Sequence, residues 1–252
     1  MYGAWHDKDW DAEEKLFMNY TTGSTDPALW RDSGAGRWNS TPATLECKAK
    51  KVFMQNGLVH AAVLVGFNAS KHLGHYLGNT GLDLMIDLGC MLEKVATARD
   101  IFNSEVKEAK EFAETLPPGT WKITSTKASP GYNIPEESRD WFYAVGGYQA
   151  WGKATVVVPP LADSPRVYSM DFEYCFFDQY NWNKGIGVPL FGMKITDDTM
   201  GEFHRQGIAK EFEMRGSHHA SVEWQAGKAA AVNVDPKMLD AALGPIYHKT
   251  SL

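Results

Sequence analysis

The longest alternation of apolar and polar residues in the chain lies within residues 167–177. Its apolar positions are Tyr168, Met170, Phe172, Tyr174 and Phe176. Successive side chains of a strand point to opposite faces of its sheet, so this pattern predicts a strand with one buried face. Segments 121–125, 140–150 and 153–158 are predicted to be the strands before it. Their short connections favour an antiparallel meander.

Residues 44–116 have mostly helical spacing of apolar positions. Leu73, Tyr76 and Leu77 form one stripe of a helix over 69–77. Asp87 is a predicted cap for a second helix, and Thr97 for a third that runs to about residue 116. The charged positions of this third helix, Glu105 among them, are expected to face solvent.

Another helix is predicted at about 198–214, followed by a glycine at position 216. Its apolar stripe consists of Met200, Phe203, Ile208 and Phe212. Thr199 and Glu202 have the spacing of a capping box. The whole pattern predicts an α+β fold, with a helical N-terminal half packed on an antiparallel β-meander.

The predicted organisation is a single domain over residues 1–252. Residues 1–43 form an irregular arm dotted with tryptophans, 44–116 are mainly helical, and 117–252 are mainly β apart from the helix at 198–214. Aromatic residues make up 12% of the chain, which suits the surfaces of a β-sheet.

Charge and cysteine content argue against several classes of protein. The formal net charge of −6 argues against a nucleic-acid-binding protein, because phosphate contacts need clustered Lys and Arg. Three well-separated cysteines predict neither a zinc site nor a disulfide framework. The N-terminus lacks the pattern of a signal peptide, so we expect a chain made in the cytoplasm.

The main candidate for chemistry comprises Asp178, Tyr180, His204 and Arg205. Asp178 and Tyr180 follow the clearest strand, and the ends of strands often carry catalytic groups. A His between core and solvent near an Asp suits general acid–base chemistry, and Arg205 suits an anion clamp. The alternative is that all four are ordinary residues at the margins of the packed elements.

Two other histidine pairs were considered as sites. His72 and His75 share one face of a predicted helix, as metal ligands require, but no convincing third ligand accompanies them. His218 and His219 are interpreted as loop residues. The sequence leaves any metal unknown.

Segments 140–148, 177–185 and 195–212 resemble C-terminal toxin or effector domains of bacterial polymorphic-toxin and secretion-system proteins. This resemblance implies delivery to a target cell by a larger carrier or secretion machinery, and neutralisation by a cognate immunity protein. It implies an antibacterial effector, with any membrane only as its target.

The order of Asp178, Tyr180, His204 and Arg205 is also similar to the catalytic pattern of the colicin M family, with Asn181 in place of the second acid. That likeness implies a hydrolase that cleaves a phosphate-bearing cell-envelope precursor with a divalent metal such as Mg²⁺. Its catalytic residues would be these four. The alternative function is a non-enzymatic module for binding, structure or membrane perturbation within a secretion or surface assembly.

Overall fold

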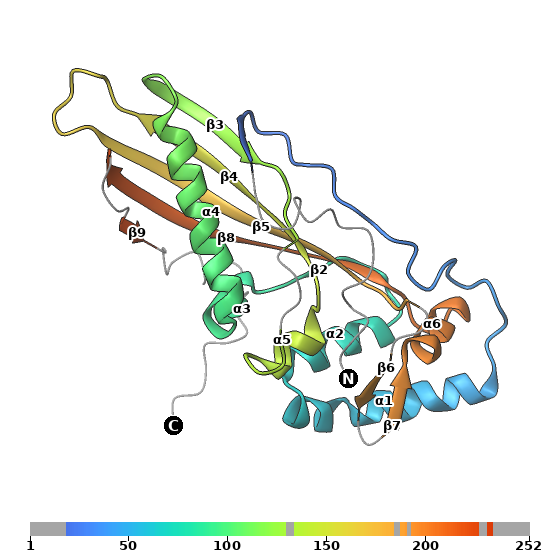
Figure 1. The fold of residues 1–252 in the computed structure, drawn as a ribbon. Coiled ribbons are helices and arrows are strands. Elements are labelled where there is room, and N and C mark those ends of the chain that lie inside the picture. Colours follow the sequence, from blue (N-terminus) through green and yellow to red (C-terminus); the bar gives the residue numbers. More distant parts are fainter. Residues whose placement is uncertain (1–18, 130–133, 184–186, 191–192, 227–230, 234–252) are drawn as a thin grey trace.

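The protein is an α+β fold built around one long, curved sheet, shown here by a computed structural model (Figure 1). The structure describes residues 19–129, 134–183, 187–190, 193–226 and 231–233. The helices are α1 (Leu45–Leu64), α2 (Phe67–Leu77), α3 (Leu88–Lys94), α4 (Ala96–Glu114), α5 (Arg139–Ala144) and α6 (Asp197–Arg205). The strands are β1 (Tyr20–Thr22), β2 (Leu84–Met85), β3 (Gly119–Ser125), β4 (Gln149–Val158), β5 (Val167–Tyr180), β6 (Gly187–Leu190), β7 (Met193–Thr196), β8 (Phe212–Gln225) and β9 (Ala231–Asn233).

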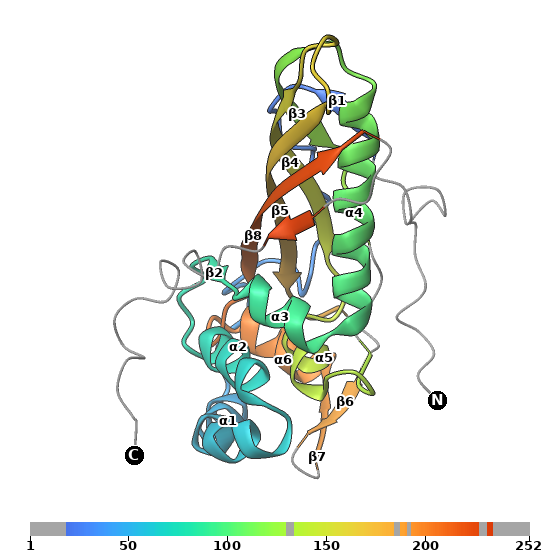
Figure 2. The ribbon, with the colours of Figure 1, turned by 90° about the vertical axis from the view of Figure 1, so that its left-hand side faces the viewer.

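The main sheet has the strand order β1-β3-β4-β5-β8-β2, and β9 also pairs with β8. The β3-β4-β5 meander is antiparallel, as the sequence predicts. β5 pairs with β8 along its whole length, from Val167 opposite Gln225 to Tyr180 opposite Phe212. α4 lies along one face of this sheet, and α1, α2, α5 and α6 gather at one end (Figure 2).

The alternation of apolar and polar residues in β5 produces one buried face, as expected. Its predicted apolar face, from Tyr168 to Phe176, is buried, and this face contributes to the main core together with α2, α3 and α4. The predicted cap of α3 is also confirmed, because the Asp87 carboxylate accepts the N–H of Cys90 at 2.8 Å.

The second face of the sheet is partly covered by the N-terminal arm. Leu29 packs against a small buried cluster of Trp151, Cys175 and Phe177. The Gln149 side chain bonds both backbone groups of Trp30, each at 2.8 Å. Cys175, on the polar side of the alternation, is therefore buried because the arm lies over it. Residues 1–18 of the arm lie outside the described part.

The predicted helix over 198–214 is half right. α6 begins at Asp197, with Thr196 as its cap instead of Thr199, and ends at Arg205. Gly207 then has φ +67°, a left-handed conformation that ends helices. Residues 212–225 form β8, in which the inward positions alternate with outward ones. The predicted apolar stripe therefore combines residues of two elements. Met200 and Phe203 belong to α6, Phe212 belongs to β8, and Ile208 lies between them.

The predicted strand over 140–150 is wrong in its first half. Residues Arg139–Ala144 form the helix α5, whose cap is the Ser138 hydroxyl accepting from Trp141 N–H at 3.3 Å. β4 then runs without a break through Trp151 and Gly152. Trp141 is fully buried in the core, and this tertiary packing outweighs its preference for strands.

Glu105 is the clearest departure from the predicted solvent-facing side of α4. Its side chain is 2% exposed and accepts a hydrogen bond from the Tyr20 hydroxyl on β1. β1 and the sheet enclose Glu105, at a position that is exposed on an isolated helix.

Thr97 lies in the first turn of α4 instead of capping it, and both its N–H and its hydroxyl donate to Glu137.

Gly152 is required where β4 passes under Glu105. A Cβ at this position would lie 2.1 Å from the Tyr20 hydroxyl and 2.6 Å from Glu105 Oε1. Gly152→Ala is expected to lower the free energy of unfolding by about 1–3 kcal/mol through overpacking, measured by urea denaturation. Gly57→Ala in α1 is the matched control, because nothing lies within 4 Å of its added Cβ. It should leave stability unchanged or raise it by up to about 1 kcal/mol.

Candidate functional site

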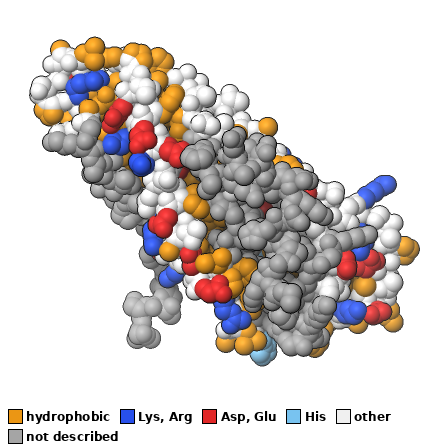
Figure 3. Space-filling model, viewed as in Figure 1, with side chains coloured by type: hydrophobic (Ala, Val, Ile, Leu, Met, Phe, Trp, Pro, Cys, Tyr) orange, Lys and Arg blue, Asp and Glu red, His pale blue; other side chains and the backbone are white. Residues whose placement is uncertain are grey.

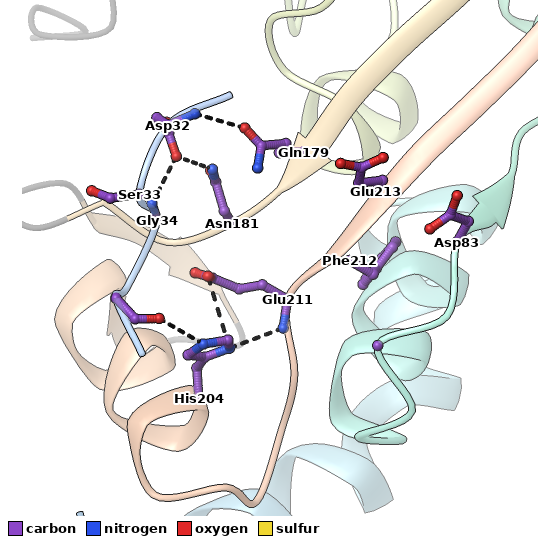
Figure 4. A pocket seen from close by; sticks show the side chains of 12 residues that line it. Asp32, Ser33, Gly34, Asp83, Gln179, Asn181, His204, Glu211, Phe212 and Glu213 are labelled. Atoms are coloured by element: carbon purple, nitrogen blue, oxygen red, sulfur yellow. Dashed lines mark hydrogen bonds and ion pairs between the residues drawn. The ribbon is translucent and has the colours of Figure 1, made fainter. Parts of the chain in front are cut away.

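An open cavity of about 250 Å³ lies where the N-terminal arm crosses the end of β5, the end of α6 and the start of β8 (Figure 4). Its wall includes Asp32 and Gly34 from the arm, Asn181 after β5, His204 on α6 and Glu211 before β8. These segments are far apart in sequence. Polar side chains that converge on a hollow from several elements are typical of a binding or catalytic site.

Glu211 is the carboxyl most enclosed by this wall. Its Oε1 accepts the N–H of Ala35 at 2.9 Å and the N–H of Trp182 at 2.8 Å. Burial raises its pKa to about 7; the charge of Asp32 adds to the rise, while the two N–H donors oppose it. Gly34 permits this arrangement, because a Cβ there would lie 2.5 Å from Glu211 Oε2. Glu211 is thus a carboxyl poised to exchange a proton near neutral pH.

His204 lies behind Glu211 with both ring nitrogens engaged. Nδ1 accepts the backbone N–H of Glu211 at 3.1 Å, which leaves the ring proton on Nε2, 3.0 Å from the Gly36 carbonyl. Burial lowers the pKa of His204, so the ring is neutral. Nδ1 is also 3.8 Å from Glu211 Oε2. The ring therefore positions Glu211 and the arm, and neither nitrogen is free to take a proton from a substrate.

Asp32, like Glu211, is a cavity carboxyl that has no Lys or Arg partner among the described residues. Its Oδ1 accepts from Gly34 N–H at 2.7 Å and from the Asn181 amide, and its Oδ2 accepts from the Asn183 amide at 2.9 Å. Three N–H donors therefore hold this one carboxylate in place. Figure 4 shows Asp32 and Glu211 on opposite sides of Asn181.

The other two cavity carboxylates are neutralised by arginines. Glu213 lies 2.5 Å from Arg31 and 2.6 Å from Arg215, and Arg215 also contacts Asp83 at 3.1 Å. Both guanidinium groups stack on Phe177, at 4.8 and 5.1 Å from the ring centroid. Asp32 and Glu211 consequently remain as the carboxyl pair available for chemistry.

Of the four residues predicted as a site, only His204 lines the cavity. Tyr180 stacks on Phe212 at 4.9 Å and contacts the aromatic rings of Tyr76 and Trp182 in the core between β5 and α2. Asp178 lies two residues earlier on the same strand face, and its carboxylate accepts the N–H of Gln179. Burial raises the pKa of Asp178 well above its ordinary range.

Arg205, the predicted anion clamp, is engaged within the protein. Its Nε and Nη2 donate to Glu202 Oε2 at 3.1 and 2.8 Å, and Nη1 donates to the Ala35 carbonyl. An acidic partner of this kind competes with a phosphate or carboxylate ligand. The structure thus brings His204 and Arg205 to the arm, whereas Tyr180 packs against the edge of the core and Asp178 lies half-buried on the same strand face.

The histidine pairs make separate contacts. His72 is buried, with Nδ1 2.7 Å from the Ala144 carbonyl, and His75 Nε2 lies 2.8 Å from the Leu82 carbonyl. His218 and His219 lie within β8 and not in a loop. Among the residues that the structure describes, no group of three or more His, Cys, Asp or Glu side chains is arranged to hold a metal ion.

Asp32 and Glu211 are not among the site residues that the sequence predicts. The Asp-Ser-Gly order at 32–34 is a readable turn signal, and the Asp32 side chain does bond the N–H two residues on. Glu211 carried no such signal, because it lies inside the helix predicted over 198–214 and belongs to no motif. Their proximity comes from the path of the arm, which no local pattern encodes.

Comparisons with protein-family models, curated proteins and solved structures gave no match to this chain. Within the described ranges, none of the helices has both the length and the apolar character needed to cross a membrane.

Proposed function

We propose that this protein is a hydrolytic antibacterial effector domain that performs acid–base catalysis in the cavity between the arm and β8. The observation that carries the proposal is Glu211, a cavity carboxyl whose burial raises its pKa to about 7. General acids work best when their pKa lies near the working pH. Glu211 would donate a proton to the leaving group, and His204 would position it.

Asp32 would act as the base. Two carboxyl groups in different environments, one as general acid and one as general base, are the arrangement used for acid–base hydrolysis of glycosidic bonds. A water molecule would attack the scissile carbon and pass its proton to Asp32, while the proton of Glu211 goes to the leaving oxygen. Proton exchange with solvent would restore both groups.

The charge of the cavity favours one of the two expected substrate classes. The negative charge of Asp32 would oppose a phosphate-bearing substrate, whereas a neutral or cationic glycan meets no such repulsion. We therefore propose a cell-envelope polysaccharide as the substrate. The antibacterial context, the carrier and the immunity protein rest on the resemblance of segments 140–148, 177–185 and 195–212 to toxin domains.

The test is hydrolysis of purified cell-wall sacculi by the full chain, followed as new reducing ends. A lipid-linked pyrophosphate precursor with and without Mg²⁺ is the comparison substrate. We expect release from the sacculi, and growth arrest of a bacterial host only when the chain is directed to its periplasm. Cleavage of the pyrophosphate substrate alone would contradict the glycan proposal and favour the colicin M-like one. Activity on neither substrate would contradict both.

A further inference from the structure

Helix α1 presents a row of apolar side chains to solvent. The row, called here the α1 outer face, consists of Leu45, Val52, Val59 and Val63. Their spacing of i, i+7, i+14 and i+18 keeps them on one side of a helix. Leu45 is 84% exposed, Val59 75% and Val63 85%. Several exposed apolar side chains on one side of a helix can mark an interaction surface.

The opposite side of α1 is the one that packs on the protein. Met54 is buried in the core, and Leu58 packs against it. The Lys51 ammonium donates to the Ile208 carbonyl at 2.7 Å. α1 lies at the end of the molecule formed by α2 and α6 (Figures 1 and 2). The outer face is therefore not a core face of this fold.

The same region is locally basic within an acidic protein. The chain has 31 Asp and Glu residues, yet none occurs from position 47 to position 82. Lys48, Lys50 and Lys71 in this stretch are exposed, and of these Lys50 pairs with Glu46 at 2.6 Å. Lys48 lies one turn from both Leu45 and Val52, at the edge of the α1 outer face. Hydrophobic, basic and acidic side chains all reach the surface at the lower right of Figure 3, where α1 lies in Figure 1.

We infer that the α1 outer face binds an anionic lipid surface, with the helix parallel to the membrane plane. A helix with an exposed apolar row edged by Lys48, and with its other side held by protein, can lie in the plane of a membrane interface. The Lys48 stem can lie along the apolar layer while its ammonium group reaches the lipid phosphates.

The charge distribution favours lipid over other occupants. Two copies of this chain packed through the α1 outer face would bring their lysines together, which costs free energy. A nucleic acid offers phosphates to the lysines but no apolar layer for Val59 and Val63. An anionic membrane satisfies both sets of side chains.

The experiment is co-sedimentation of the full chain with phosphatidylcholine vesicles, with and without phosphatidylglycerol. We expect binding that requires the anionic lipid and weakens in high salt. Val59→Asp with Val63→Asp should lower the partition coefficient at least about tenfold, and Lys48→Gln roughly fivefold. Leu161→Asp is the matched control, because Leu161 is 74% exposed and lies in the turn between β4 and β5, so its partitioning should match wild type.

Circular dichroism checks that each variant is folded, and Lys48→Gln gives an independent test should the double variant unfold. The inference is overturned if wild type stays in solution with both vesicle types, or if it binds neutral vesicles equally. It is also overturned if light scattering shows a dimer that the Val59/Val63 variant dissociates while vesicle binding is absent.

Discussion

Glu211→Gln is expected to lower the rate of hydrolysis by about 10²- to 10⁴-fold, the usual contribution of a general acid. Glutamine keeps an oxygen that can accept the Ala35 and Trp182 N–H groups, but it has no proton to donate. In the wild type, activity should decline as the pH rises through about 7, where Glu211 loses its proton. Initial rates from pH 5 to 9 measure both effects.

The matched control is Asp178→Asn, which makes the same acid-to-amide change outside the cavity. It should retain activity close to that of wild type. Glu211→Gln should also melt at or above the wild-type temperature at pH 8, because burial favours the uncharged side chain. If Asp178→Asn is inactive while Glu211→Gln is active and folded, the proposed role of Glu211 is wrong.

The second large expected effect is on the pH dependence of stability, and it comes from Glu105, which is buried between α4, β1 and β4. Burial raises its pKa to about 8, from an ordinary value of 4.5. The folded protein therefore holds a proton that the unfolded chain releases above about pH 4.5. The stabilising contribution is complete below pH 4.5 and is lost as the pH rises through about 8. Between these limits we expect the free energy of unfolding to fall by about 3–5 kcal/mol.

Glu105→Gln should remove most of this pH dependence, because its amide is neutral at every pH. Urea denaturation followed by tryptophan fluorescence from pH 4.5 to 9 measures the slope. The control is Glu111→Gln on the same helix, where the carboxylate is exposed and pairs with Lys107 at 3.7 Å. Its slope should match wild type. An unchanged slope in Glu105→Gln would show that other groups carry the pH dependence.

Local sequence patterns determined several elements of this protein. The strict alternation from Tyr168 to Phe176 specifies β5 and its buried face, because a one-residue shift would turn five large side chains outward. Asp87 determined the start of α3, since its carboxylate bonds an N–H only three residues away. The α+β class follows from such short-range patterns.

Only the tertiary structure decided the rest. Residues 208–214 fit a helical stripe in sequence, but Gly207 ends the helix and pairing with β5 makes β8 from Phe212 onward. Pairing between distant strands leaves only a weak local signal when small and polar residues such as Gly216 interrupt the alternation.

The predicted site also differs from the observed cavity because contacts between distant segments decide which side chains meet. The sequence selected Asp178, Tyr180, His204 and Arg205 because they are polar residues at the margins of two apolar patterns. The fold packs Tyr180 against the core and engages both nitrogens of His204. The arm brings Asp32 beside Glu211, and burial, which depends on all the enclosing elements together, sets the protonation of Glu211.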